Sequence, residues 1–160
     1  LPCFDPSSAQ EAYEMIQEAF EYSEEYGTPV FLRPTTRVCH GYASVTVKDD
    51  KEFTQHKPEG FIKDSKRWVI FPRLSFMNHQ KIEARNRELS DVFSSYDKNS
   101  KKGIATGGIS YTYAMETLKN TGMVKNLKVA TPHPFPEKLA VEFLTGLDEV
   151  LCLEELDPVI

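Results

Sequence analysis

The sequence between Gly103 and Leu156 alternates short apolar runs with segments long enough to form helices. The apolar runs are Ile104–Thr106, Leu127–Ala130 and Val150–Leu153, and the segments between them carry apolar residues at spacings of three and four. Strands that alternate with helices of this length predict right-handed β-α-β units and a parallel sheet. The chain is therefore expected to be an α/β protein.

In parallel sheets of this kind, chemistry takes place at the carboxyl ends of the strands. In this sequence those ends are Gly107–Ser110, Thr131–Phe135 and Glu154–Asp157. A binding or active site in this part of the chain is expected among these three segments.

The bulk properties narrow the class of protein. The 160 residues suffice for one domain with a real core, and the formal net charge of -5 argues against a nucleic-acid surface. No apolar run approaches the roughly 20 residues that a membrane span needs. Neither nucleic acid nor a membrane is therefore an expected partner.

The first residues, LPCFDPSS, have no signal-peptide pattern and read as sequence from within a domain, so a fragment of a longer protein is expected.

The three cysteines, Cys3, Cys39 and Cys152, are far apart and odd in number. They predict no disulfide framework, which favours a reducing cytoplasm. Cys152 lies in an apolar run and is expected to be a buried free thiol. No pair has the C-x-x-C spacing of a zinc or iron–sulfur site.

The first 33 residues predict one helix followed by one strand. Ser8 and Glu11 have the spacing of a capping box at the start of the helix, and Gly27 is placed to end it in a left-handed conformation. Pro29–Arg33 is continuously apolar up to its last residue, as expected of a strand covered on both faces. Together they are interpreted as the closing helix and strand of a parallel-sheet domain whose other strands lie upstream.

A group of polar residues follows that strand directly: Arg33, Thr35, Thr36, Arg37 and His40. Two guanidinium groups, two hydroxyls and an imidazole within eight residues would suit a phosphate or a carboxylate. The alternative is a strand-end loop whose arginines pair with neighbouring carboxylates. The second interpretation is favoured because arginine and threonine are common in loops.

The middle of the chain predicts a connection between two domains. A strand is expected over Tyr42–Val47, and residues 48–77 read as a linker ending in the apolar anchor Trp68–Pro72. Ser75 or Asn78 is expected to cap a connecting helix that reaches Tyr96. The predicted domains are thus residues 1–47 and 78–160, on either side of the linker.

One pair on that connecting helix has the spacing of metal ligands. His79 and Glu83 are four residues apart, but the second histidine of an H-E-x-x-H pattern is missing. A solvated pair is therefore the favoured interpretation, and no metal site is predicted.

The turn after the first strand of the later unit contains Gly107 and Gly108, with Ser110 as the expected N-cap of a helix that Gly122 ends. The pattern is neither G-x-G-x-x-G nor a Walker sequence. Backbone amides at this helix start would suit an anion. Tight packing of helix on strand explains the glycines equally well and is the favoured interpretation. A nucleophile elbow around Ser110 is disfavoured because Thr112 replaces its second glycine.

Two further groups of residues have both a chemical and a structural interpretation. His133, in a loop stiffened by three prolines, would serve as a proton carrier or an interface contact, but packing of a rigid loop is favoured. The acids Glu154 and Glu155 would suit acid–base work, but solvation or a domain contact suffices to explain them. Pro136 is expected at the first position of the intervening helix, which Gly146 closes.

Several separate segments of the chain resemble one family in the same order. They are EAYEMIQEAFEYSEEYGTPVFLRPTTRVCHG, KRWVIFPRLSFMNH, GIATGGISYTYAMETL, KVATPHPFPEKLAVEFL and EVLCLEELDPVI. These segments are similar to the α subunit of the indolepyruvate ferredoxin oxidoreductases, which are thiamine-diphosphate-dependent 2-oxoacid:ferredoxin oxidoreductases. The resemblance covers nearly the whole chain and is weakest in the polar stretch at residues 48–66.

This resemblance implies a fold and an activity for the whole enzyme. The segment Glu11–Arg33 would close the domain that binds the aminopyrimidine of thiamine diphosphate, and the part from Lys102 onward would resemble the three-layer α/β/α C-terminal domain of transketolase. The family oxidatively decarboxylates arylpyruvates such as indolepyruvate, forms an acyl-CoA and reduces ferredoxin. Its cofactors are thiamine diphosphate, magnesium and [4Fe-4S] clusters, and its partners include a β subunit, ferredoxin and coenzyme A.

The sequence departs from the family in extent. It contains neither a G-D-G…N diphosphate–magnesium motif nor the C-x₂-C-x₂-C-x₃-C-P cluster pattern. No catalytic residue is therefore predicted in this chain, which alone is expected to be inactive and to bind no cofactor. Thr35, Thr36, Arg37, His40, Ser110 and His133 are the candidates for a cleft or interface. The alternative hypothesis is a non-catalytic interaction module with the same fold.

Overall fold

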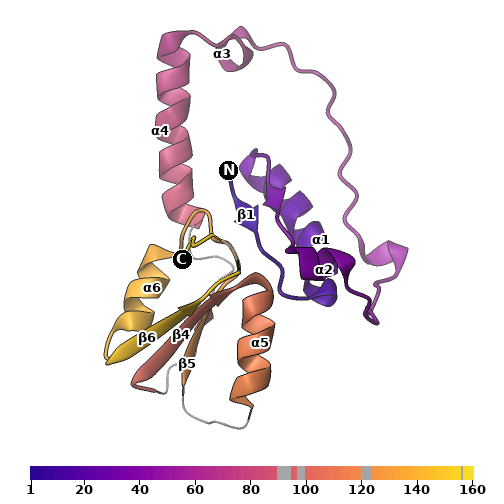
Figure 1. Cartoon of the computed structure of the whole chain (residues 1–160). Helices are drawn as coiled ribbons and strands as arrows, with labels where there is room; N and C mark the ends of the chain where they lie inside the picture. The colour runs from indigo at the N-terminus through magenta and orange to yellow at the C-terminus, as the bar shows by residue number, and fades with distance from the viewer. Residues whose placement is uncertain (90–94, 97–99, 120–123, 156) are drawn as a thin grey trace. The chain divides into compact units, whose positions relative to one another are not determined.

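The computed structural model describes residues 1–89, 95–96, 100–119, 124–155 and 157–160 (Figure 1). The chain divides into two compact units. The first comprises residues 1–45 and 89–160, and the second comprises residues 46–88. Each unit is described by itself below.

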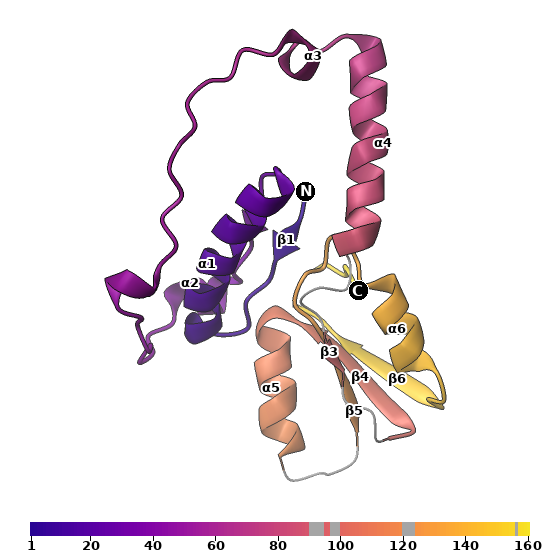
Figure 2. The ribbon, with the colours of Figure 1, turned by 180° about the vertical axis from the view of Figure 1, so that it is seen from behind.

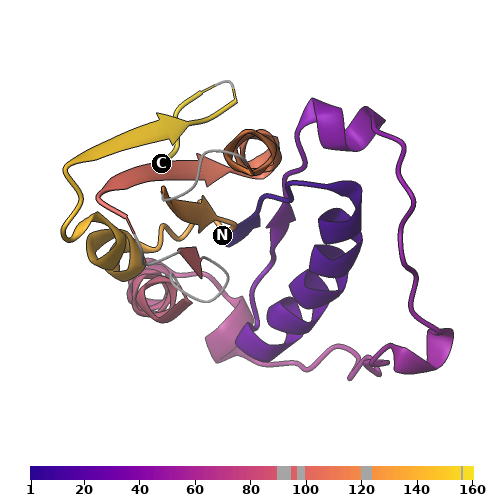
Figure 3. The same cartoon turned by 90° about the horizontal axis from the view of Figure 1, so that it is seen from below.

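The first unit begins with a small parallel sheet covered by one helix. Strand β1 (Cys3–Phe4) pairs in parallel with β2 (Phe31–Leu32), and helix α1 (Ala9–Tyr26) connects them. Figure 3 shows α1 running beside these two strands. A short helix, α2 (Thr36–His40), follows β2. Strand β1 was not predicted, because two residues between prolines carry no readable strand pattern.

Helix α1 is amphipathic and has capping groups at both ends. The Ser8 side chain accepts a hydrogen bond from the Glu11 backbone N–H, which satisfies a donor that has no partner within the helix. Gly27 ends the helix with φ at +56°, a conformation that favours glycine, as predicted. The buried face of the helix consists of Met15, Ala19 and Tyr22, which pack against Phe4.

The second sheet of this unit has four strands in the order β3-β5-β4-β6. Strands β4 (Lys102–Gly107), β5 (Lys125–Val129) and β6 (Glu149–Leu153) are parallel, and β3 (Ser95–Tyr96) runs antiparallel to β5. The three predicted strands and their parallel pairing are confirmed.

Two helices lie on opposite faces of this sheet (Figures 1 and 2). Helix α6 (Glu137–Leu144) covers the face of Ala105, Leu127 and Val129, which form a buried cluster with Phe143. Helix α5 (Gly108–Leu118) covers the other face, where the Asn126 amide nitrogen lies 2.9 Å from the Met115 sulfur. Successive residues of a strand point to opposite faces of the sheet. Leu127 and Val129 of β5 therefore face α6, whereas Asn126 faces α5. The expected three-layer α/β/α arrangement is confirmed.

The second unit contains a 3₁₀ turn at Asp50–Glu52 and the helices α3 (Ser65–Trp68) and α4 (Pro72–Leu89). The predicted strand at Tyr42–Val47 is wrong: this stretch has no secondary structure, and the Tyr42 side chain is fully exposed. The residues there alternate between apolar and polar, but in the described part of the chain no strand pairs with them. The domain boundaries at residues 47 and 77 stay predictions.

The connecting helix differs from its predicted extent. Helix α4 begins six residues earlier, at Pro72, because proline at the first helical position loses no hydrogen bond. Ser75 and Asn78 therefore lie inside the helix and cap nothing. The helix ends at Leu89, and Tyr96 belongs to strand β3 instead.

Five predictions about the strands and turns also need correction. Cys152 is exposed, because β6 lies at the edge of the sheet. Phe31 of β2 is exposed, so this strand is not covered on both faces. Gly107 rather than Ser110 is the N-cap of α5, which places Ser110 within the first turn. Pro136 is the N-cap of α6 rather than its first residue, and Thr145 rather than Gly146 is the C-cap. Gly122 lies outside the described residues.

No helix in the described ranges is long and apolar enough to cross a membrane.

Replacing Phe143 by alanine tests the core between α6 and the sheet. Phe143 is 1% exposed, so Phe143→Ala leaves a cavity and is expected to lower the free energy of unfolding by about 3–5 kcal/mol. Val141→Ala, on the exposed side of the same helix, is the matched control and is expected to cost less than about 0.5 kcal/mol. Urea denaturation followed by circular dichroism measures both; equal losses would mean that α6 does not pack as described.

Candidate functional site

The crevice of this sheet lies between the carboxyl ends of β4 and β5. Helix α5 leaves β4 toward one face, whereas the segment after β5 leads to α6 on the other face. Such a reversal is where α/β proteins usually bind their ligands. In this chain, residues 1–8 lie at that position.

Backbone and side-chain hydrogen bonds hold this first segment in place. The Cys3 N–H donates to the His133 carbonyl at 2.7 Å, and the Asp5 N–H donates to the Ala130 carbonyl at 2.9 Å. The Thr112 hydroxyl of α5 donates to the Ser7 carbonyl at 2.8 Å. Residues 1–8 of the same chain therefore occupy the crevice, where their backbone N–H and carbonyl groups form hydrogen bonds.

Asp5 is the most deeply buried acidic group at this position. It is 4% exposed, and its Oδ2 accepts a hydrogen bond from Arg33 at 3.2 Å. Its Oδ1 is buried without a hydrogen-bond partner among the described residues. Burial raises the pKa of the Asp5 carboxyl above its ordinary value, the Arg33 guanidinium offsets part of this rise, and the carboxylates of Glu11 and Glu155 add to it.

Gly108 makes room for this carboxylate. Its φ is +50°, and a Cβ at this residue would lie 3.0–3.3 Å from the Asp5 carboxyl atoms. A larger residue would therefore meet both backbone strain and a steric clash. The contacts at Gly108 are thus with the Asp5 carboxylate, and those at Gly107 are with Ile160, the Val129 carbonyl and Asp5. The sequence favoured packing of helix on strand as the reason for this glycine pair, and these contacts do not bear that interpretation out.

A small cavity of about 20 Å³ adjoins this carboxylate. Asp5, Arg33, Thr35, Gly107 and Glu155 are among the residues that line it. The Thr35 hydroxyl and one Glu155 carboxylate oxygen are buried without a hydrogen-bond partner in the described part of the chain, as is Asp5 Oδ1. A volume of this size is large enough for a water molecule.

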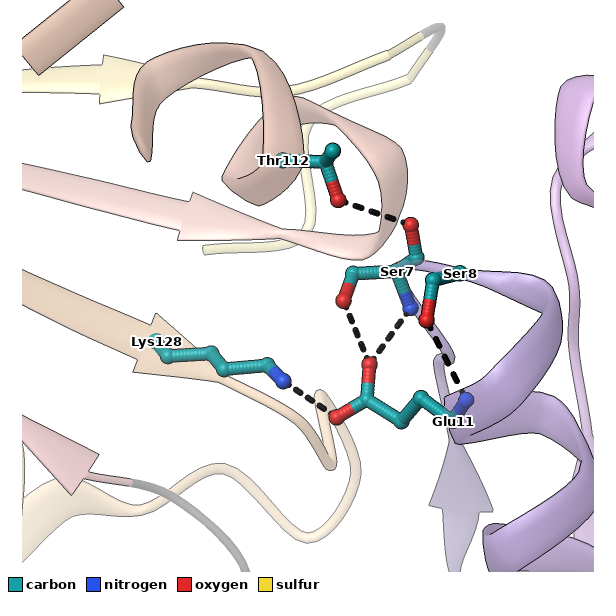
Figure 4. A network of polar contacts seen from close by, with 5 residues as sticks. All are labelled: Ser7, Ser8, Glu11, Thr112 and Lys128. Atoms are coloured by element: carbon teal, nitrogen blue, oxygen red, sulfur yellow. Dashed lines mark hydrogen bonds and ion pairs between the residues drawn. The ribbon is translucent and has the colours of Figure 1, made fainter. Parts of the chain in front are cut away.

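A second polar cluster lies beside the first and joins α1 to the sheet (Figure 4). One carboxylate oxygen of Glu11 accepts hydrogen bonds from the Ser7 N–H at 2.7 Å and the Ser7 hydroxyl at 2.5 Å, and the other pairs with the Lys128 ammonium group. The Glu11 carboxylate therefore does not return to the Ser8 backbone. The predicted capping box is formed only by the Ser8 half.

The Glu11–Lys128 pair is shielded from solvent. Its two side chains are 19% and 17% exposed, and the Lys128 ammonium group also lies 4.5 Å from the centre of the Tyr111 ring. Burial alone would raise the pKa of Glu11, but hydrogen bonds from Lys128 and Ser7 outweigh it and hold the pKa below its ordinary value. Glu11 is therefore ionised at neutral pH and ties α1 to β5.

The predicted polar group after β2 lies on and around α2. Arg33 pairs with Asp5, which agrees with the favoured interpretation of a paired arginine. Thr35 lines the small cavity, whereas Thr36 and His40 are exposed on α2. The Arg37 guanidinium lies 5.9 Å from the Tyr113 ring of α5. These residues form a short helix rather than the expected loop, and they do not converge on one point.

The other candidates lie at the strand ends. Ser110 is half-buried in the first turn of α5. The His133 ring is exposed, with Nδ1 2.8 Å from the Leu1 carbonyl oxygen. Glu154 accepts hydrogen bonds from the backbone N–H groups of Val159 and Ile160, so it orders its own loop. The interpretations of Ser110, His133 and Glu154 stay predictions.

Metal ligation has little support in the described ranges. His79 Nε2 lies 3.9 Å from Glu83 Oε1 with both side chains exposed, as expected of a solvated pair. Among the described residues, no three His, Cys, Asp or Glu side chains are grouped so that they would hold a metal ion.

Sequence reasoning missed Asp5 and Lys128 and assigned Glu11 only a capping role. One signal for Lys128 was present, because a lysine flanked by Leu127 and Val129 interrupts a strand that is otherwise apolar. A charge in such a strand needs a partner. Asp5 had no comparable signal, since Asp-Pro is also common before helices.

Comparison with known proteins extends the observations on the fold. No family model matches the sequence. Curated proteins do match: a protein of Methanothermobacter thermautotrophicus is 38% identical over 99% of this chain, and proteins of Pyrococcus abyssi and Thermococcus kodakarensis are each 37% identical over 100% of it. The chain spans only 26–27% of the length of these relatives.

All three relatives are subunits of one kind of oxidoreductase, which agrees with the class expected from the sequence motifs. Each is named indolepyruvate oxidoreductase subunit IorA. The resemblance to this family is therefore confirmed, and the whole chain corresponds to about a quarter of an IorA subunit.

The Glu11–Lys128 pair can be tested by a double-mutant cycle. Glu11→Gln and Lys128→Met each leave a shielded charge without its partner and are each expected to lower the free energy of unfolding by about 2 kcal/mol. The double variant is expected to lose less than the sum, because neither charge remains. Lys102→Met, which breaks an exposed pair with Glu149, is the control and should change stability little. Strict additivity in urea denaturation would contradict the pairing.

Replacing Asp5 by asparagine tests the sign of its pKa shift. A folded-state pKa above 3.8 means that the folded protein holds the proton more tightly than the unfolded one. Between 3.8 and the folded pKa, the unfolding free energy of the wild type should therefore fall, relative to Asp5→Asn, as the pH rises. Urea denaturation between pH 3.5 and 7 measures this difference, with Asp157→Asn as an exposed control. If the unfolding free energy of the wild type rose with pH relative to Asp5→Asn, the Arg33 guanidinium would lower the pKa of Asp5 by more than burial raises it.

Proposed function

We propose that this chain is the part of an IorA-type subunit that joins a pyrimidine-binding domain to a domain like the transketolase C-terminal domain. The observation that carries the proposal is the match of the whole chain to one quarter of each relative at 37–38% identity. The two sheets of the first unit, held together by residues 1–8, provide the structural basis for such a junction.

The complete enzyme is proposed to act in the cytoplasm on 2-oxoacids of the arylpyruvate class, such as indolepyruvate. In the overall reaction the 2-oxoacid loses its carboxyl group as CO₂, the remaining acyl group is transferred to coenzyme A, and two electrons pass to ferredoxin. Thiamine diphosphate with magnesium would supply the carbanion chemistry and [4Fe-4S] clusters the electron path. A β subunit and the other domains of the same subunit are the proposed partners.

We assign no cofactor-binding site and no catalytic step to the described residues. The cavity beside Asp5 has a volume of about 20 Å³, and no three His, Cys, Asp or Glu side chains among the described residues are grouped to hold a metal ion. The proposed role of this chain is to keep two domains in a fixed arrangement, with Glu11 and Lys128 as positioning residues.

Measuring activity in the complete protein tests this proposal. The complex purified from its source is expected to reduce methyl viologen when given indolepyruvate, coenzyme A and thiamine diphosphate, whereas the isolated 160-residue chain is expected to be inactive. Isothermal titration calorimetry should detect no binding of thiamine diphosphate to the isolated chain. Glu11→Gln in the complete protein should lower the thermal midpoint of the subunit more than Lys102→Met.

Two results would contradict the proposal. Turnover by the isolated chain would mean that the catalytic residues lie within it. A complete protein without 2-oxoacid-dependent activity would instead support the alternative of a non-catalytic interaction module.

A further inference from the structure

Three oxygen atoms of the first unit are buried without a hydrogen-bond partner among the described residues. They are Asp5 Oδ1, the Thr35 hydroxyl oxygen and Glu155 Oε2. The side chain of Asp5 is only 5% exposed. All three residues line the cavity of about 20 Å³, where the segments after β1, β2 and β6 meet. Because a buried polar oxygen without a partner is costly, these atoms indicate that the cavity binds a further group.

The charges around the cavity favour a cation as that group. Among the described residues, its lining contains one guanidinium, that of Arg33, and four carboxylates: Asp5, Glu154, Glu155 and Asp157. The Arg33 side chain is half-exposed and bonds to the other carboxylate oxygen of Asp5, Oδ2. Burial is the main cause that raises the pKa of Asp5, and repulsion by the Glu155 carboxylate adds to it. A water molecule would satisfy hydrogen bonds but would leave this excess of negative charge uncompensated.

The size of the cavity and the type of ligand narrow the kind of cation. The cavity has room for about one water molecule, which is close in size to a K⁺ ion without its hydration shell. Hydroxyl, carbonyl and carboxylate oxygens replace the hydration shell of K⁺ readily. A Ca²⁺ site usually contains several carboxylates, and in the described ranges no three acids or other metal-ligating side chains are grouped in this way. A monovalent cation therefore fits better than a divalent one.

We propose that one dehydrated K⁺ ion binds in this cavity to Asp5 Oδ1, the Thr35 hydroxyl oxygen and Glu155 Oε2. Backbone carbonyl oxygens of other lining residues would complete its shell. The ion would join the segments that follow β1, β2 and β6, so its role is to stabilise the first unit. This inference does not rest on the proposed oxidoreductase activity.

Urea denaturation of the chain in different chloride salts tests the proposal. Tetramethylammonium is too large for the cavity, so replacing it by K⁺ at about 150 mM should stabilise the folded state. A dissociation constant of about 50 mM or tighter would lower the unfolding equilibrium constant by a factor of about four or more. If the wild type unfolds equally in both salts, the cavity does not bind K⁺ and the proposal is overturned.

Two variants test whether the effect arises at this cavity. Glu155→Gln and Thr35→Val each remove a ligand, so K⁺ should lower their unfolding equilibrium constants by less than about 1.5-fold. Glu25→Gln removes an exposed carboxylate of α1 outside the cavity and should keep the full effect of the wild type. An effect of K⁺ that persists undiminished in both cavity variants would mean that the ion binds elsewhere, which would also overturn the proposal.

Anomalous scattering from Tl⁺, which replaces K⁺ at oxygen-lined sites, locates the ion directly. Crystals of the wild type soaked in thallium(I) acetate should show an anomalous peak between Asp5, Thr35 and Glu155. This measurement decides the question if the two cavity variants do not fold. A cavity without an anomalous peak would contradict the proposal, because a water molecule or a proton shared by the two acids would then satisfy these oxygens.

Discussion

The first unit depends on the backbone hydrogen bonds of residues 2–5. On one side, the Phe31 N–H donates to the Pro2 carbonyl and the Arg33 N–H to the Phe4 carbonyl. On the other side, Cys3 and Asp5 donate to the segment after β5. This strand thus pairs with β2 on one side and bonds to the segment that follows β5 on the other, and its Phe4 side chain, which is fully buried, packs against α1 and Ala130. A single short strand therefore connects the two-stranded sheet to the segment that leaves the four-stranded sheet.

This arrangement determines where polar groups must be buried. The crevice of an α/β sheet is polar, since the strand ends and a helix N-terminus leave backbone groups without partners there. In this chain the first segment supplies those partners, but it brings the Asp5 carboxylate and the Glu11 carboxylate with it. Glu11 meets Lys128 and Ser7, whereas the one side-chain donor that Asp5 meets among the described residues is the half-exposed Arg33. The pKa of Asp5 is therefore raised and that of Glu11 is lowered. The two shifts differ in sign because Glu11 meets more hydrogen-bond donors than Asp5 does.

The same arrangement explains why a glycine-rich turn between a strand and a helix need not indicate a nucleotide. The turn between β4 and α5 accommodates an aspartate of the same chain, and Gly108 leaves the space for it. The similarity to IorA proteins extends over the full chain, which spans about a quarter of the length of these relatives.

Much of the fold could be read from the sequence because it rests on local patterns. The three parallel strands, helix α1 with its Ser8 cap and Gly27 terminator, and the helices on both faces of the sheet all follow from periodicity and from residues with strong backbone preferences. The family resemblance was equally a property of the sequence. These features need no knowledge of which segments meet in space.

The tertiary structure alone decided the site. Strand β1 exists only because residues 3–4 lie between β2 and the segment after β5, and no local pattern predicts such a pairing. Glu11 and Lys128 are 117 residues apart, so their contact could not be inferred from spacing. Conversely, Tyr42–Val47 has the alternation of a strand but no strand beside it, and Cys152 is exposed because β6 lies at an edge. Strand pairing and burial depend on neighbours distant in sequence, and a single sequence does not state which neighbours those are.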